Sequence, residues 1–231
     1  MPAKLDRRVA DLPVDDRQER TKLRLLEAAG ELFAEHGFEQ TSIREICARA
    51  STNVASVNYH FGGKLQLYQA AISFWIKVAS ERFPPQMGVR SEDPPETQLR
   101  AFVRGYLLRL FSSGKPAWHA RLVAREMNHP TGAWEAVVQS ILRPQMMLME
   151  TIVGRVVGPD ATRDLIEKGV LVIASQCVFL HVCRPAVEVT YPRQAPNEQN
   201  IDELADAIAT VSFHGLQALA RRSSKPKVRR R

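Results

Sequence analysis

Residues 41–64, TSIREICARASTNVASVNYHFGGK, decide the fold of this chain. Ser42 and Glu45 have the spacing of a capping box, in which the serine hydroxyl and the glutamate carboxylate each accept a backbone N–H at the start of a helix. The apolar residues that follow at helical spacing are Ile43, Ile46 and Ala50. The pattern predicts a short helix that begins after Ser42 and buries one face.

A second short helix is predicted directly afterwards. Ser51, Thr52 and Asn53 favour a turn and a helix cap, and Gly62-Gly63 suits the left-handed conformation that ends a helix. The buried stripe of this helix is Val54, Val57 and Phe61, and its opposite face is Ala55, Ser56, Asn58, Tyr59 and His60. Two short helices joined by a tight turn are the layout of a helix-turn-helix, whose second helix enters the major groove of DNA.

The outward face of the second helix has the chemistry that reading DNA requires. Small side chains let the backbone approach the groove, Ser56 and Asn58 can bond base edges, and Ala55 can touch a thymine methyl. Tyr59 and His60 are long enough to reach phosphates. An ordinary polar surface helix is the alternative interpretation of the same face.

The flanking segments continue the helical pattern. A stripe over about 17–36 precedes the motif and ends at Gly37; its members are Leu25, Leu26, Ala29, Leu32 and Phe33. Another amphipathic helix begins at Lys64. In this order the segments resemble the N-terminal domain of the TetR family of bacterial transcriptional regulators over roughly residues 20–75. The resemblance rests on the series Ala28-Ala29, Leu32-Phe33, Gly37-Phe38, Thr41-Ser42-Ile43-Arg44-Glu45-Ile46, Val57-Asn58-Tyr59-His60-Phe61 and Lys64-Leu65.

The resemblance implies roles for several residues. Thr41, Tyr59, His60 and Lys64 correspond to family positions that contact phosphates. Asn58 departs from the family, which often has Tyr or Leu-Tyr where this chain has Val57-Asn58, so Asn58 is a candidate for reading a base.

Composition and charge bound the rest of the interpretation. The chain has 231 residues, of which 45% are apolar, enough for one small and one larger domain. Three unpaired cysteines, no run of 18 apolar residues and no charged-then-apolar start favour a cytoplasmic protein without a signal peptide or a membrane span.

The net charge of +7 is not spread over the chain. Residues 221–231 hold seven Lys and Arg and no acid, whereas residues 1–64 hold ten of each sign. DNA binding must therefore depend on local placement, with Arg44, Lys64 and helix N-termini toward phosphate. The basic end can add non-specific attraction to phosphates, or it can be a solvated, disordered tail.

Proline and glycine clusters organise the chain. We expect a flexible arm over 1–16, a helix-turn-helix DNA-binding domain over 17–63, a helical ligand-binding and dimerisation domain over 64–222, and a basic disordered tail over 223–231. Helices are predicted near 97–112, 117–128, 133–156, 160–184 and 201–222, with a break over 185–200. No alternating strand pattern occurs, so the predicted fold class is all-α.

The last two predicted helices indicate a homodimer. The segment 165–182 is apolar on nearly all sides, so it must be covered on both of its faces. The interface residues we predict are Leu171, Phe179, Val182, Ile208 and Val211. A central helix within a monomer is the alternative. The family resemblance favours the dimer, and two-fold symmetry suits a palindromic operator.

Residues 117–150 are the candidate sensor for a small-molecule inducer. This region mixes large apolar side chains with a few ionisable groups, as ligand pockets do, and the predicted lining is Trp118, Arg125, Met127, His129 and Met146. Arg125-Glu126-Met127 followed by Pro130-Thr131 is similar to TetR regulators with a CecR-type C-terminal domain. Met and Trp at helical spacing are also common in ordinary cores.

No other chemistry is indicated. Cys177 and His181 stand four residues apart, but two ligands fall short of the four that a structural zinc site needs, so we expect no metal and no cofactor. Hydrolase and phosphate-binding motifs are missing from the sequence, so we expect no enzyme. The sequence predicts a ligand-responsive repressor that binds double-stranded operator DNA as a homodimer. The alternative is a helical ligand-binding or adaptor protein, or a helical enzyme, without specific DNA binding.

Overall fold

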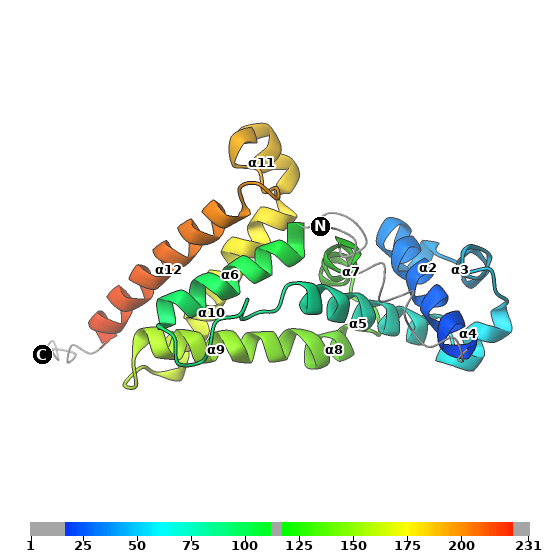
Figure 1. Cartoon of the computed structure of the whole chain (residues 1–231), viewed down its shortest axis with the longest axis horizontal. Helices are drawn as coiled ribbons and strands as arrows, with labels where there is room; N and C mark the ends of the chain where they lie inside the picture. The colour runs from blue at the N-terminus through cyan, green and yellow to red at the C-terminus, as the bar shows by residue number, and fades with distance from the viewer. Residues whose placement is uncertain (1–16, 112–116, 224–231) are drawn as a thin grey trace, which may run out of the picture. The chain divides into compact units, whose positions relative to one another are not determined.

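The structure is a computed structural model that describes residues 17–111 and 117–223. The predicted N-terminal arm and, apart from Ser223, the predicted basic tail lie outside these residues. Every regular element in the described ranges is a helix (Figure 1), which confirms the all-α fold class there. The chain forms two compact units, Met1–Ala71 and Ile72–Arg231. Helix α5 (Lys64–Arg82) begins in the first unit and continues into the second.

Three helices and the start of α5 build the N-terminal unit. They are α2 (Arg17–Gln40), α3 (Ile43–Arg49) and α4 (Val54–Phe61). Gly37 interrupts α2 with a φ of 82°, a conformation that glycine adopts without a steric penalty. The core consists of fully buried side chains from all four helices: Leu25, Phe33, Ile46, Val57, Leu67 and Tyr68. Phe33 meets Tyr68 edge to face with ring centroids 4.8 Å apart.

The caps predicted around the turn are present. Ser42 accepts the Glu45 N–H at 3.2 Å, and its own N–H donates to Glu45 Oε2 at 2.8 Å. Asn53 caps α4, and Gly62 ends it in the left-handed conformation with a φ of 85°. These caps fix where α3 and α4 begin and where α4 ends, and the burial of Ile46 and Val57 in the core supplies the packing that helices this short require.

The C-terminal unit is a larger helical assembly (Figure 1). Its elements are α6 (Pro95–Phe111), α7 (Ala117–Asn128), α8 (Trp134–Val137), a π-helical turn (Val138–Leu142), α9 (Arg143–Val157), α10 (Arg163–Val182), α11 (Arg184–Thr190), a 3₁₀ turn (Pro192–Gln194) and α12 (Ile201–Ser223). Helices α6, α9, α10 and α12 supply one continuous core. Gly169 of α10 makes the closest approach, because a Cβ there would lie 2.6 Å from Leu216 of α12.

Two segments differ from the sequence-based expectation. The helix predicted over 133–156 contains the π-helical turn just before Pro144. Proline has no N–H to complete the α-helical ladder, so the turn before it widens. The predicted break over 185–200 contains α11, which starts with a proline in its first turn, where a missing N–H costs nothing.

Candidate DNA-binding surface and regulatory cavity

The outward face of α4 is open to solvent. Ala55, Asn58 and Tyr59 are exposed, and Tyr59 keeps 71% of its surface accessible. His60 is half-buried, and its ring meets that of Tyr59 edge to face at 5.0 Å. The predicted groove-facing residues of α4 therefore share one surface, while Val57 anchors the opposite side in the core.

The Ser56 side chain takes part in the N-terminal cap of α4. Asn53 Oδ1 accepts both the Ser56 N–H at 3.0 Å and the Ser56 hydroxyl at 3.1 Å. The Thr52 hydroxyl donates to Ser56 Oγ at 2.9 Å. The Ser56 hydroxyl thus belongs to the cap of α4, whereas the Asn58 side chain is exposed on the same face.

The structure corrects the role expected for the Thr41 side chain. Only 1% of Thr41 is exposed, and its hydroxyl lies 2.8 Å from the Gly37 carbonyl and 3.2 Å from the Leu32 carbonyl. A buried hydroxyl that donates to backbone carbonyls is not presented to a phosphate. The hydroxyl of Thr41 links the residue before α3 to backbone carbonyls of α2. The family resemblance alone did not indicate this structural role.

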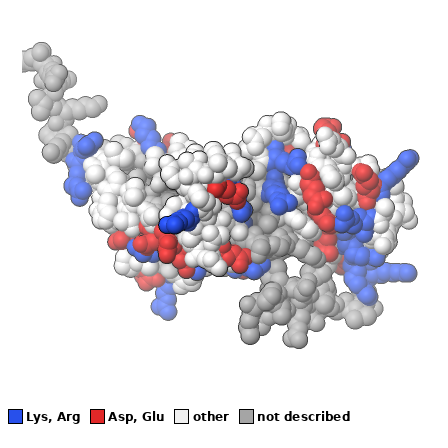
Figure 2. Space-filling view, turned by 90° about the horizontal axis from the view of Figure 1, so that it is seen from above, with Lys and Arg blue, Asp and Glu red and all other residues white. Residues whose placement is uncertain are grey.

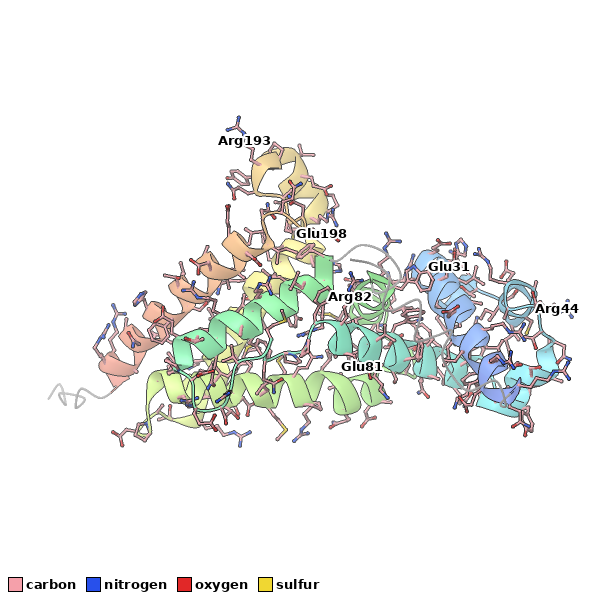
Figure 3. All side chains as sticks on the ribbon, in the orientation of Figure 1. Glu31, Arg44, Glu81, Arg82, Arg193 and Glu198 are labelled. Carbon is pink, nitrogen blue, oxygen red and sulfur yellow. The ribbon has the colours of Figure 1, made fainter. Side chains whose placement is uncertain are left out.

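Two basic residues flank the open face. Arg44, on the first turn of α3, is exposed and points away from the unit (Figure 3). Lys64 Nζ lies 4.5 Å from the Phe38 ring centre and 3.3 Å from the Glu39 carbonyl oxygen. Arg49 forms an ion pair with Glu31 at 2.8 Å, so its charge is partly neutralised. In Figure 2 basic and acidic side chains alternate over the N-terminal unit, which agrees with its balanced charge.

A cavity of about 60 Å³ lies in the C-terminal unit. Its walls come from α5, α6, α7, α9 and α10, with Leu142 from the π-helical turn, and most of its surface is apolar. Met127 alone of the five predicted ligand-binding residues is among the residues that line it. The two basic side chains in the lining are Arg109 and His181.

The other four predicted ligand-binding residues do not line this cavity. Trp118 meets Trp75 edge to face at 4.9 Å, and Met146 packs against the core. His129 is exposed after the end of α7, and Arg125 is half-exposed. The sequence interpretation confined the sensor to 117–150, but helices from distant parts of the chain form the cavity walls.

A signal for Arg109 and His181 was present in the sequence. Arg109 continues the buried stripe of α6, whose earlier members are Leu99, Phe102 and Tyr106, and His181 continues the stripe Val170, Ile173 and Cys177 of α10. An ionisable residue that prolongs an apolar stripe is expected to be buried. Burial lowers the pKa of His181, so its ring is neutral at pH 7.

A second hollow, of about 510 Å³, lies beside the segment that joins α5 to α6. Two of its polar side chains are already engaged: Gln98 donates to the carbonyls of Arg90 and Ser91, and Arg155 donates to that of Asp93 at 3.1 Å. These bonds hold the connecting segment in place.

Helices α10 and α12 expose apolar side chains in long stripes. The α10 stripe includes Leu171, with 67% exposed, and Phe179, with 57% exposed, together with Val182. On α12, Val211 and Leu219 are exposed, but Ile208 is buried in the core of its own unit. Ile208 is therefore removed from the predicted interface. Figure 2 shows broad areas of the C-terminal unit without Lys, Arg, Asp or Glu.

Helix α10 is long and apolar enough to span a membrane by length and composition alone, with a mean hydropathy of 1.6 over its best window. Only 28% of that window is buried. Its partly exposed apolar surface equally suits a helix that packs against a second copy of the chain.

Each of the two units contains a segment that matches a known protein family. Residues 25–71 match the family of bacterial regulatory proteins of the TetR type. Residues 95–218 match the C-terminal domain of the HTH-type transcriptional dual regulator CecR. The chain therefore belongs to the TetR family of transcriptional regulators, which are not enzymes. Within this family it has a C-terminal domain of the CecR type.

Individual relatives agree with this assignment. The dual regulator CecR of Shigella flexneri is 29% identical over 152 residues, which cover 62% of this chain and 67% of that protein. The probable regulator YttP of Bacillus subtilis is 43% identical over 83 residues, which cover 36% of this chain and 40% of YttP.

Solved structures show the same fold. AibR, solved in complex with isovaleryl coenzyme A and operator DNA, has a TM-score of 0.61 at 19% identity, covering 84% of this chain and 98% of the AibR chain. The hemolysin II regulator HlyIIR has a TM-score of 0.59 at 21% identity, covering 82% of this chain and 97% of its own.

Proposed function

We propose that this regulator is a cytoplasmic repressor that binds a palindromic operator as a homodimer and is released by a small molecule. The open, polar face of α4 carries the proposal, because the cap at Asn53 and the buried Val57 hold Asn58 and Tyr59 outward. Residues 17–63 form the proposed DNA-binding domain and residues 64–222 the proposed ligand-binding and dimerisation domain.

The contacts on DNA divide by chemistry. Asn58 reads a base edge, for which adenine is the best match to an amide. Ala55 lies against the groove, with Ser56 beside it as both cap and contact. Tyr59, His60, Arg44 and Lys64 bind phosphates, which position the helix but carry no sequence information.

The exposed stripes of α10 and α12 form the proposed dimer interface. Its members are Leu171, Phe179, Val182 and Val211, with Leu219 added by the structure. Two such helices from each protomer form a four-helix arrangement with a two-fold axis, and removal of their apolar surface from water stabilises it.

Ligand control passes through α5 in this proposal. Ile76 of α5 lines the cavity, and the same helix begins in the N-terminal unit. A molecule in the cavity changes DNA affinity only if it prefers one arrangement of α5 over another. AibR, which has the same fold, was solved in complex with both isovaleryl coenzyme A and operator DNA, so a protein of this fold binds both kinds of partner.

Selection of bound duplexes from a random pool tests the function. We expect an enriched palindrome whose half-sites lie about one helical turn apart or a multiple of it. The matched control is the variant Asn58→Ala, which is expected to select an altered sequence at one position in each half-site. Failure of the parent to enrich any sequence would instead support the helical adaptor without specific DNA binding.

A further inference from the structure

Arg109 is buried to an extent that is unusual for a charged residue. It lies near the end of α6 and lines the cavity of the C-terminal unit, yet only 3% of its surface is exposed. Its neighbours in the lining are mostly aliphatic, among them Ile76, Leu110, Val123 and Val178. Arginine is almost never fully buried without a partner of opposite charge.

The guanidinium of Arg109 has only part of its hydrogen bonding satisfied. Nη1 donates to the Phe83 carbonyl at 2.7 Å, whereas Nη2 is buried and has no partner. Among the ion pairs of the described residues none involves Arg109. The Tyr106 ring lies 5.6 Å from its central carbon.

The neighbouring groups do not neutralise this charge. Burial lowers the pKa of Arg109 to about 10, so the side chain remains protonated at pH 7. Burial raises the pKa of Tyr106 and of Cys177 to about 12, so both are neutral at the same pH. A buried cation without a counter-charge opposes folding, which makes Arg109 a poor choice if its only role is structural.

Other arginines of the same unit show what a structural role looks like. Arg104, also on α6, pairs with Asp202 through two contacts of 2.6 and 3.2 Å and stays partly exposed. Arg184 pairs with Glu188 at 2.7 Å. Against these, Arg109 keeps one buried donor, Nη2, without an acceptor among the described residues, and the residue belongs to the lining of the apolar cavity.

We propose that the regulatory ligand is a compact apolar carboxylic acid, bound as its carboxylate to Arg109. This inference rests on the proposed ligand-controlled function and names the chemical class of its ligand. A guanidinium offers parallel N–H donors that match a carboxylate, and such charge-assisted bonds are about twice as strong as neutral ones. The aliphatic lining covers the rest of the molecule, and the cavity of about 60 Å³ favours a short chain, whereas a ring requires the cavity to widen.

The position of Arg109 also connects the ligand to α5. Phe83 directly follows the last residue of α5, and its carbonyl is the acceptor of Nη1. Gly105 keeps this region tight, because a Cβ there would lie 2.8 Å from the Pro84 carbonyl oxygen and 3.4 Å from Arg109 Nη1. A carboxylate that draws the guanidinium into the cavity therefore acts on the bond that holds the end of α5.

Ligand binding without DNA tests the inference. The probes are hexanoate, benzoate and phenylacetate, each compared with its uncharged amide, and phenyl phosphate serves as a phosphate of similar size. Binding to the full chain is measured by ligand-observed NMR and by the shift of the melting temperature. We expect at least one carboxylate to bind about tenfold or more tightly than its amide and than phenyl phosphate.

Two variants assign that preference to the residue. Arg109→Met is expected to abolish the carboxylate preference, while the matched control Arg104→Met on the same helix keeps it. Arg109→Met is also expected to melt at a higher temperature than the parent in the absence of ligand, because an unpaired buried charge is removed.

Three outcomes would overturn the inference. They are no carboxylate preference in the parent, an equal preference in Arg109→Met, or tighter binding of phenyl phosphate than of every carboxylate. A lower melting temperature of Arg109→Met together with an unchanged ligand preference would assign Arg109 to a structural role at Phe83. The ligand-binding assay contains no DNA, so it is independent of the duplex selection. If the parent chain enriches a palindrome but shows no carboxylate preference, this inference fails and the proposed DNA binding stands. If a carboxylate binds to Arg109 but does not change the affinity of the protein for its operator, ligand control of DNA binding fails and the assignment of the ligand class stands.

Discussion

The two units treat their buried polar groups in opposite ways. In the described N-terminal unit, the buried hydroxyl of Thr41 is satisfied by carbonyls of its own unit. In the C-terminal unit, Arg109 Nη2 and His181 Nδ1 are buried without a partner, and both residues line the cavity. A surface that reads DNA must be rigid before its target arrives, whereas a ligand cavity keeps unsatisfied groups for the ligand to complete.

The same contrast extends to apolar groups. Val57 of α4 is fully buried, whereas Val54, predicted to belong to the same buried stripe, is 40% exposed. The rest of the exposed face is polar or small apart from Tyr59. Helices α10 and α12 leave large apolar side chains in water. The described face of α4 therefore leaves little apolar surface in contact with water. In our proposal the exposed apolar surface of α10 and α12 is buried only when a second copy of the chain binds.

The largest effect is expected from a charge placed on the exposed stripe of α10. Phe179→Asp is expected to give monomers and to reduce operator affinity at least tenfold, because a carboxylate would be buried without a partner between protomers. Light scattering and operator titration measure the two effects. The matched control is Met147→Asp, an exposed apolar position on α9, which is expected to remain dimeric. A well-folded monomer for the parent chain would remove the interface from the proposal.

The next effect concerns the DNA surface. Asn58→Ala is expected to weaken binding of the selected operator by about 1–3 kcal/mol and to relax preference at one base pair per half-site. Tyr59→Ala and Lys64→Ala are each expected to weaken binding to all duplexes equally, and Lys64→Ala is expected in addition to lower the salt dependence of DNA affinity. Operator titrations at several salt concentrations distinguish these outcomes. Unchanged sequence preference in Asn58→Ala would show that α4 lies differently in the groove.

A smaller effect compares buried polar groups directly. Thr41→Val keeps the shape of the side chain but removes the donor to the Gly37 and Leu32 carbonyls, so the free energy of unfolding is expected to fall by about 1 kcal/mol. The salt dependence of operator binding should stay the same, since the hydroxyl does not reach phosphate. Chemical denaturation and DNA titration measure the two quantities. A reduced salt dependence with unchanged stability would restore Thr41 as a phosphate contact.

The smallest effect is a pH dependence of the C-terminal unit. Burial lowers the pKa of His181 below its ordinary value of 6.5, so the folded state favours the neutral ring. The unfolded chain binds a proton first as pH falls through 6.5, and stability contributed by His181 is lost from there down to its folded pKa. Melting curves between pH 8 and pH 5 should show a smaller decrease for His181→Leu than for the parent. An equal decrease in both proteins would assign the pH dependence to other groups.

The helix-turn-helix was predictable from the sequence because its determinants are local. Ser42 and Glu45 form the predicted capping box, Gly62 ends α4, and Val57 faces the core as its spacing indicates. Each of these depends on residues within one or two helical turns, so the order of side chains along the chain is sufficient. Thr41 was misassigned because its burial depends on the end of α2, which the motif alone does not reveal.

Only the tertiary structure decided the cavity and the faces of the long helices. Arg109, Met127 and His181 come from α6, α7 and α10, and no local pattern states that these helices meet around one space. Ile208 and Val211 lie three residues apart on α12, yet one is buried in its own unit and the other is exposed. The sequence by itself determined the class of regulator, since caps and stripes are short-range. The burial of the Arg109 guanidinium without a counter-charge could not be read from the sequence. It depends on how helices that are distant along the chain pack around this side chain.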